Sequence, residues 1–257
     1  MKIATSLLLL FVPALLYSQF RAQPVISPEP MPDVLGPPPV QWMVGLDAGL
    51  NVNQHPGSFK TKLCECTFSD GSGRGILLGG EIWHRFSRRI AISFKVLYDD
   101  LQGQYSSILE NDTTLMDDGT KVPLDYERIG DVRLTYLMFN PMLQYSPFGE
   151  LYVMAGPAVG ITARAEYQYR LRHLNPDYVF VSTQTDESVI EDWTDIPDAN
   201  TIRIDVRFGL GYNLWLNRAV VFSPEISYSV PMTGISNVSG WEANTLRAVG
   251  VIKFVIK

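Results

Sequence analysis

Apolar and polar residues alternate with a period of two in eight separate stretches of the chain after residue 40. In the first stretch Trp42, Val44 and Leu46 alternate with Gly45 and Asp47. A period of two places apolar residues on one face of a β-strand and polar or small residues on the other. No charged residue stands on the apolar faces, although 19% of the chain is charged. The pattern predicts strands over residues 42–52, 76–86, 90–98, 137–145, 151–161, 204–214, 220–228 and 246–256.

The connections between these stretches alternate between short and long. Three of them are turns of a few residues, around Ser87-Arg88, Pro147-Phe148-Gly149 and Asn217-Arg218, and the other four are long loops. Short turns at one end and long loops at the other are typical of outer-membrane barrels, whose turns face the periplasm. The fold class expected is therefore all-β, an eight-stranded antiparallel up-and-down transmembrane β-barrel whose last strand closes against the first.

Alternation alone does not say which face points outward, because a soluble eight-stranded barrel has the same pattern inverted. The apolar faces are too bulky to fit inside eight strands. The polar faces carry small residues that suit a crowded interior: Gly45, Gly49, Gly79, Gly156, Gly160, Gly209 and Gly211. Aromatic residues gather at the strand ends, where a membrane barrel has its girdles. They are Trp42, Phe86, Tyr145, Phe222 and Phe254 near the turns, and Tyr98, Tyr136, Tyr167 and Tyr228 near the loops. These features favour apolar faces that meet lipid.

Two irregularities are expected in the strands. The alternation changes phase between Tyr136 and Leu137, which predicts a β-bulge. Pro141, Pro157 and Pro224 fall inside strands on the outward face, where each removes a donor from the ladder.

The N-terminus predicts export. Residues 1–18 resemble a signal peptide, with Lys2 followed by a short apolar run from Leu7 to Leu16. Residues 19–40 hold seven prolines and predict an extended periplasmic leader. The barrel is expected over 41–257, in the outer membrane, with both mature termini periplasmic.

Composition narrows the partners. The formal net charge of −6 argues against nucleic acid, whose phosphates demand a basic surface. Acidic residues crowd the second and third long loops: Glu110, Asp112, Asp117, Asp118, Asp125 and Glu127 in one, and Asp186, Glu187, Glu191, Asp192, Asp195 and Asp198 in the other. They predict solvated extracellular loops. The alternative is contact with a protein partner or, through divalent cations, with lipopolysaccharide beside the lipid bilayer.

The polar faces place charges of nearly balanced sign inside the barrel. The residues expected there are Asp47, Glu81, Arg85, Lys95, Asp99, Arg164, Glu166, Arg203, Asp205, Arg207, Glu225, Arg247 and Lys253. Buried charges must be paired, so we expect a salt-bridge network that fills the lumen. A proton or ion path is the alternative. Bulky inward residues, including Trp83, Trp215 and Tyr152, predict a lumen closed to solutes.

Catalytic chemistry has little support. The three histidines His55, His84 and His173 belong to no recognisable metal or nucleophile motif, so we expect no catalytic, cofactor-binding or metal residues. Cys64 and Cys66 have a C-x-C spacing that allows a strained disulfide in an oxidising compartment, a shared metal site or a link to another chain.

Short motifs resemble a known family. They are Tyr136-Leu137 with Pro141, Tyr152-Val153-Met154-Ala155-Gly156-Pro157, and Ser223-Pro224-Glu225-Ile226-Ser227-Tyr228. They are similar to the porin-like outer membrane protein beta-barrel family of Gram-negative bacteria, which includes PorT-type proteins. The resemblance implies the barrel and its location but no single activity. We expect a non-enzymatic barrel that acts structurally or through its loops. The alternatives are a narrow channel, a PorT-type secretion or assembly accessory, and a soluble periplasmic ligand-binding barrel.

Overall fold

The computed structural model describes residues 41–62, 66–115, 120–175, 177–180, 182–236 and 240–256. Eleven strands occur in these segments: β1 Gln41–Lys60, β2 Thr67–Arg85, β3 Ile90–Asp100, β4 Gly103–Leu115, β5 Lys121–Phe148, β6 Leu151–His173, β7 Glu187–Asp195, β8 Ile202–Tyr212, β9 Leu214–Trp215, β10 Val220–Pro231 and β11 Asn244–Ile256. Across those segments, no helix is long and apolar enough to cross a membrane.

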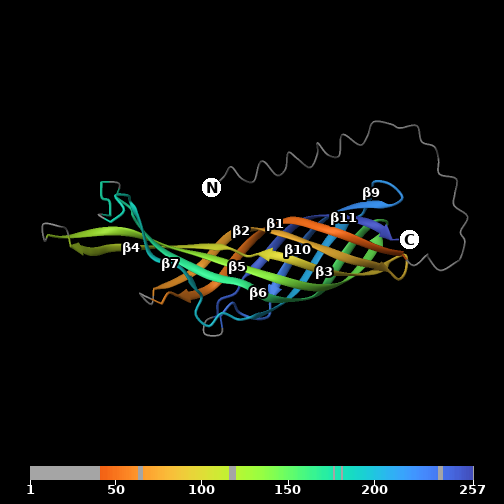
Figure 1. Ribbon diagram of the computed structural model, residues 1–257, viewed down its shortest axis with the longest axis horizontal. Coiled ribbons are helices and arrows are strands. Elements are labelled where there is room, and N and C mark those ends of the chain that lie inside the picture. Colours follow the sequence, from red (N-terminus) through yellow and green to blue (C-terminus); the bar gives the residue numbers. More distant parts are fainter. Residues whose placement is uncertain are drawn as a thin grey trace, which may run out of the picture. The chain divides into compact units, whose positions relative to one another are not determined.

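Eight of the strands form a closed antiparallel ring (Figure 1). The order around it is β1, β2, β3, β5, β6, β8, β10 and β11, and each strand pairs with the next. β11 returns to β1 through a ladder that runs from Trp42 opposite Ile256 to Gln54 opposite Asn244. The expected eight-stranded antiparallel barrel is confirmed, and its first and last strands meet as expected.

The outer face of the ring is apolar and the inner face carries the polar residues. Along β1, Leu46 is 66% exposed on the outside, while the adjacent Asp47 is 3% exposed on the inside. The same alternation holds for Ile82 and Glu81 on β2 and for Val206 and Arg207 on β8. Residues whose hydrophobicity would bury them in a soluble protein therefore cover the outside.

The expected long loops prove to be largely strand, which corrects the sequence interpretation. β5 has 28 residues and β6 has 23, whereas about 9 to 11 suffice to cross a bilayer. β4 pairs with the first part of β5, and β7 pairs with the last part of β6. We call the resulting β4–β5–β6–β7 extension the far-end sheet; Figure 1 shows it projecting past the ring, opposite the short turns. Charged residues alternate with apolar ones in the far-end sheet, and those on neighbouring strands form ion pairs that stabilise it.

The expected irregularity occurs beside Tyr136, but the additional residue belongs to the partner strand. Thr135 lies opposite Arg164 and Tyr136 lies opposite Thr162, so Ala163 has no partner on β5. A one-residue bulge of this kind reverses the facing of every residue that follows it on the same strand. The expected phase change in β5 is therefore wrong, and the phase changes on β6 instead.

Several sequence predictions concern residues outside the described segments. They are the signal peptide over 1–18, the leader over 19–40, the acidic residues Asp117 and Asp118, and Cys64. The disulfide between Cys64 and Cys66 therefore stays a prediction.

We expect a charge on the outer face to be far more harmful than a charge in the far-end connections. Phe208 lies at the middle of β8 and is 47% exposed on the outer face. Where that face meets lipid, Phe208→Arg should cost about 2–4 kcal/mol near the bilayer midplane. Ser182→Arg, at an exposed position between β6 and β7, is the control. Folding into liposomes, followed by heat-modifiable gel mobility, measures both; equal folding of the two variants would contradict a lipid-facing belt.

Candidate functional site

Ten of the charges expected in the lumen are buried there. They comprise five acids and five bases: Asp47, Glu81, Asp99, Asp205 and Glu225, and Lys95, Arg203, Arg207, Arg247 and Lys253. Each comes from the inward face of β1, β2, β3, β8, β10 or β11. The strict alternation of these strands is what brings charges from distant parts of the sequence into one interior.

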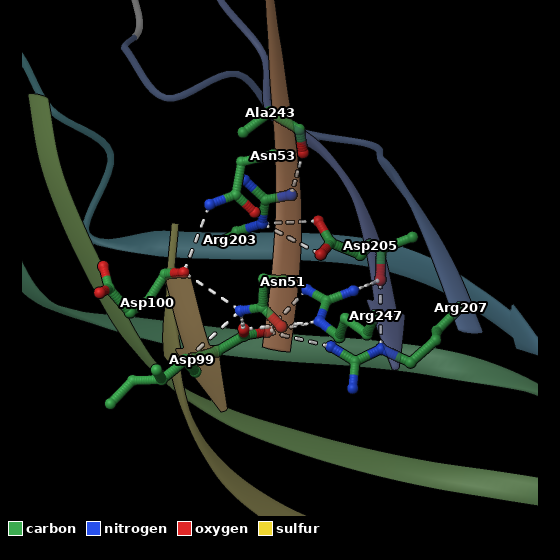
Figure 2. A network of polar contacts seen from close by, with 11 residues as sticks. Asn51, Asn53, Asp99, Asp100, Arg203, Asp205, Arg207, Ala243 and Arg247 are labelled. Carbon is green, nitrogen blue, oxygen red and sulfur yellow. Dashed lines mark hydrogen bonds and ion pairs between the residues drawn. The ribbon is translucent and has the colours of Figure 1, made fainter. Parts of the chain in front are cut away.

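Asp99 is the centre of the first cluster (Figure 2), and it lies next to the last residue of β3, Asp100. Its carboxylate accepts hydrogen bonds from Arg247 Nη2 (2.6 Å) and Arg207 Nη2 (3.3 Å). The amide of Asn51 donates to Asp99 Oδ1 (2.6 Å) and also to the Asp100 carbonyl oxygen (3.1 Å). Asp99 thereby connects β3 with β1, β8 and β11 across the inside of the ring.

Arg203 extends this cluster toward the mouth of the lumen. Its guanidinium forms an ion pair with Asp205 (2.8 Å) and donates to the Ala243 carbonyl oxygen (2.6 Å). It also lies over the Tyr136 ring, 5.5 Å from the centroid. Ser229 accepts from both Arg247 (2.6 Å) and Arg207 (3.1 Å). These hydrogen bonds hold three guanidinium groups side by side although their charges repel.

Lys95 is the centre of the second cluster, which lies closer to the short turns. Its ammonium group is 2.7 Å from Glu225, 3.2 Å from Glu81 and 3.6 Å from Asp47. Lys253 approaches Glu81 from the other side (3.5 Å). This cluster has three carboxylates and two ammonium groups, whereas the Asp99 cluster has three guanidinium groups and two carboxylates. The two surpluses are opposite, so the lumen as a whole is balanced.

Little space remains between the two clusters. The cavity that Asp47, Lys95, Arg207 and Glu225 border has about 10 Å³ of free volume, which is about what one water molecule needs. Closer to the short turns, Trp83 Nε1 donates to Gln144 (2.8 Å). The cavity therefore gives no sign of a water-filled path.

An aromatic plug closes the lumen toward the far-end sheet. It contains Phe68, Tyr105, Tyr136, Tyr167, Tyr169 and Trp241, which are all buried in one apolar cluster. The indole of Trp241 donates to the Tyr105 hydroxyl (2.5 Å). The sequence interpretation missed this plug because it treated most of the residues between the expected strands as loops. Its signal was the continued alternation of Val132, Leu134 and Tyr136 ahead of the expected strand.

Six expected positions differ in the structure. The side chains of Arg164 and Glu166 are 55% and 31% exposed and pair with each other outside the lumen (3.8 Å), because the bulge at Ala163 reverses their facing. Trp215 is exposed on β9 rather than inward. Tyr136 and Tyr167 belong to the plug rather than to an outer girdle. Arg85 is only half-buried at the turn end, where its guanidinium lies over Trp83 (5.1 Å).

Ion pairs stabilise one face of the far-end sheet. Arg170 pairs with Asp131 and Glu187, and Arg172 pairs with Glu127 (3.2 Å) and Glu187 (3.0 Å). Burial alone raises the pKa of Glu187, but hydrogen bonds from Arg172 and Arg170 outweigh it and hold that pKa below the ordinary 4.5. Glu127 and Glu187, which the sequence suggested as solvated loop charges, are thus structural partners of arginines.

The connection after β6 folds back on the other face of the far-end sheet. His173 packs against Tyr126 and Phe180, with ring centroids 4.7 and 4.3 Å apart, and its backbone N–H donates to the Asp186 carbonyl oxygen (2.7 Å). Burial lowers the pKa of His173 from its ordinary 6.5, and attraction to Asp186 offsets part of that effect. We call these residues the tip cluster.

No group of three or more His, Cys, Asp or Glu side chains in the described segments could hold a metal ion. The two other histidines, His55 and His84, belong to no such group within the described segments. His55 is buried beside Tyr105, and His84 stacks between Trp42 and Phe86 on the outer face (4.0 and 4.5 Å).

Comparison with known proteins finds similar folds among outer-membrane proteins. No family model matches the chain, and no curated protein matches it. Neisserial surface protein A shares 9% identity, covers 83% of this chain and 96% of its own, and has a TM-score of 0.32. Ail, the attachment invasion locus protein of Yersinia pestis, shares 7% identity over 83% of this chain and 98% of its own (TM-score 0.35). Outer membrane protein AlkL shares 14% over 86% and 92% (TM-score 0.40).

With identities of 14% or less and TM-scores of 0.40 or less, these likenesses say nothing about activity. The fold rests on the strand pairing of this chain itself. The PorT-type resemblance stays a prediction.

We expect Asp99→Asn to destabilise the barrel severely. The substitution leaves Arg207 and Arg247 buried beside Arg203 with one fewer negative charge, and breaking a buried pair costs about 3–5 kcal/mol. Asp198→Asn is the control, because Asp198 is exposed and forms no ion pair within the described residues. Unfolding in urea, with the folded barrel followed by gel mobility, measures both. A loss for Asp99→Asn no larger than that of the control would contradict the role of Asp99.

Acidification should loosen the tip cluster before it affects the ring. Because the folded tip lowers the pKa of His173, its stabilisation is complete above pH 6.5 and declines as the pH falls below that value. Glu187 stays ionised across this window. Hydrogen-exchange protection of residues 173–187 should fall between about pH 7.5 and about pH 5.5. His173→Phe should keep the packing and remove the pH dependence; an unchanged dependence in that variant would assign it to another group.

Proposed function

We propose that this chain is a non-enzymatic integral outer-membrane β-barrel protein that acts structurally or through contacts made outside the cell by its far-end sheet. The observation that carries the proposal is the inversion of the ring, apolar outside and charged inside. An apolar outer surface of this extent is costly in water and favourable in lipid. A closed ring also satisfies the backbone hydrogen bonds of a strand in hydrocarbon.

The interior supports a structural role rather than transport or catalysis. The buried charges pair with one another, and the space between the two clusters is about the size of one water molecule. A narrow channel is the rival hypothesis, for which steady and uniform single-channel conductance of the purified protein in planar bilayers would be the evidence. We expect none.

The far-end sheet supports a role in contacts. β7 pairs with β6 alone among the described strands, and β4 pairs with β5 and, at one point, with β2 where Ser72 faces Gln104. Each of the two strands therefore has a side with unpaired backbone groups, and such edges can accept a strand of a partner protein. Alternation of short turns and long hairpins favours placing this sheet outside the cell, with both mature termini in the periplasm.

Cysteine labelling of intact cells tests the proposed placement. In a Cys64→Ser/Cys66→Ser background, Thr120→Cys and Thr183→Cys introduce thiols at exposed positions of the far-end connections, and Arg218→Cys introduces one in the turn between β9 and β10. A membrane-impermeant maleimide should label the first two and not the third. Equal labelling of Arg218→Cys on intact cells would contradict the topology, and recovery of the protein in the soluble periplasmic fraction would favour the ligand-binding barrel.

A further inference from the structure

A groove crosses the outer face where the ring passes into the far-end sheet. It has about 470 Å³ and lies between β2, β4 and β5, with Trp193 of β7 at its side. β3 ends at Asp100 and β4 begins at Gly103, so the strand between β2 and β5 is interrupted at this level. The groove occupies the interruption.

Two glycines line the groove, and one of them lets its two strands approach closely. Gly73 of β2 and Gly103 of β4 line it with backbone alone. A Cβ on Gly73 would lie 2.1 Å from the Gln102 carbonyl oxygen, so only glycine lets the two strands approach there. The Gln102 amide then donates to the Arg74 carbonyl oxygen (2.6 Å) and joins the strands across the gap.

Two arginine side chains line the groove without an ion-pair partner. Neither Arg74 nor Arg133 forms an ion pair among the residues that the structure describes, although the Asp100 carboxylate is near enough to attract Arg133. The nearby Asp131 is engaged by Arg170 Nε (2.7 Å) and by the amide of Gln104 (2.9 Å). The Arg133 guanidinium lies 3.6 Å from the centroid of the Trp193 ring, which holds it in one orientation. The groove therefore offers two cationic donors, one of them held in place in advance.

The groove lies just beyond the apolar outer face of the ring, which we call the apolar belt. Arg74 is the first outward residue of β2 beyond Ile76, which is exposed on the belt, and it follows at a distance of about 7 Å along the strand. Tyr98, the last outward apolar residue of β3, is exposed below it. The Asp100 carboxylate accepts the N–H of Gln102, which lines the groove (3.2 Å). Cationic groups at this level meet lipid headgroups rather than acyl chains.

We propose that this groove binds a phosphorylated lipid headgroup of the outer leaflet, the glucosamine phosphate of lipopolysaccharide. Guanidinium groups bind phosphate through paired, charge-assisted hydrogen bonds, and the acyl chains of such a lipid continue along the belt below. The assignment rests on the proposed function, because it needs the belt to lie in the membrane with the far-end sheet outside.

The test measures binding of diphosphoryl lipid A to the refolded full chain in zwitterionic detergent. The variant is Arg74→Gln/Arg133→Gln, and the matched control is Arg88→Gln/Arg89→Gln, which removes two exposed arginines from the turn between β2 and β3. Heat-modifiable gel mobility establishes that each protein is folded. We expect affinity to fall about tenfold or more in the variant and to stay unchanged in the control.

Further measurements separate the possible outcomes. Dephosphorylated lipid A should bind the wild type and the variant equally weakly. Equal binding of diphosphoryl lipid A to the wild type and the variant would overturn the site. Displacement of the lipid by equimolar inorganic phosphate would assign the groove to free phosphate and overturn the lipid assignment. Failure of the wild type to enter membranes at all would overturn the proposed function, whereas an inserted barrel that binds lipid A without these arginines would overturn only this inference.

Discussion

The buried pairing of Asp99 with Arg247 and Arg207 is the interaction on which the rest of the barrel depends. Eight strands close a ring that is too narrow to hold bulk water yet wide enough to need filling. Charges inside it must find partners on other strands, since each unpaired one would cost several kcal/mol. Asp99 supplies that partner to two strands at once and takes a further hydrogen bond from Asn51 on a third. The register of the ring and the pairing of the charges therefore specify each other.

The same constraint explains the separation of charge along the lumen. The Lys95 cluster has one carboxylate more than it has ammonium groups. The Asp99 cluster has one guanidinium group more than it has carboxylates. The two surpluses have opposite sign, so the ten buried charges are balanced over the lumen as a whole. Above them the plug around Trp241 and Tyr105 excludes water from the side that the ring leaves open. The interior is consequently a core made of salt bridges capped by an aromatic layer.

The sequence predicted the ring well because a period of two is a strong signal when one face must exclude every charge. Ten of the lumen charges, from Asp47 to Lys253, could be located from the alternation of inward and outward residues alone. This alternation reverses after an inserted residue, which is why Arg164 and Glu166, beyond Ala163, were assigned to the wrong face. The far-end sheet escaped prediction because its outward residues, such as Asp131 and Arg170, are as polar as loop residues. Only their pairing across the ladder, which depends on three-dimensional proximity, distinguishes them from a solvated connection.

The length of β5 and β6 has a mechanical consequence. Their ladder runs without a change of partner from Phe148 opposite Leu151, beside the turn, to Tyr126 opposite His173 at the tip. A force that pulls on the tip acts along the strands, whereas the hydrogen bonds between antiparallel strands lie across them. The load is then shared in shear by many bonds at once instead of opening them one after another. A force applied to the outermost residues of the far-end sheet is thus transmitted along β5 and β6 to the part of the ring that contains Asp99 and Lys95.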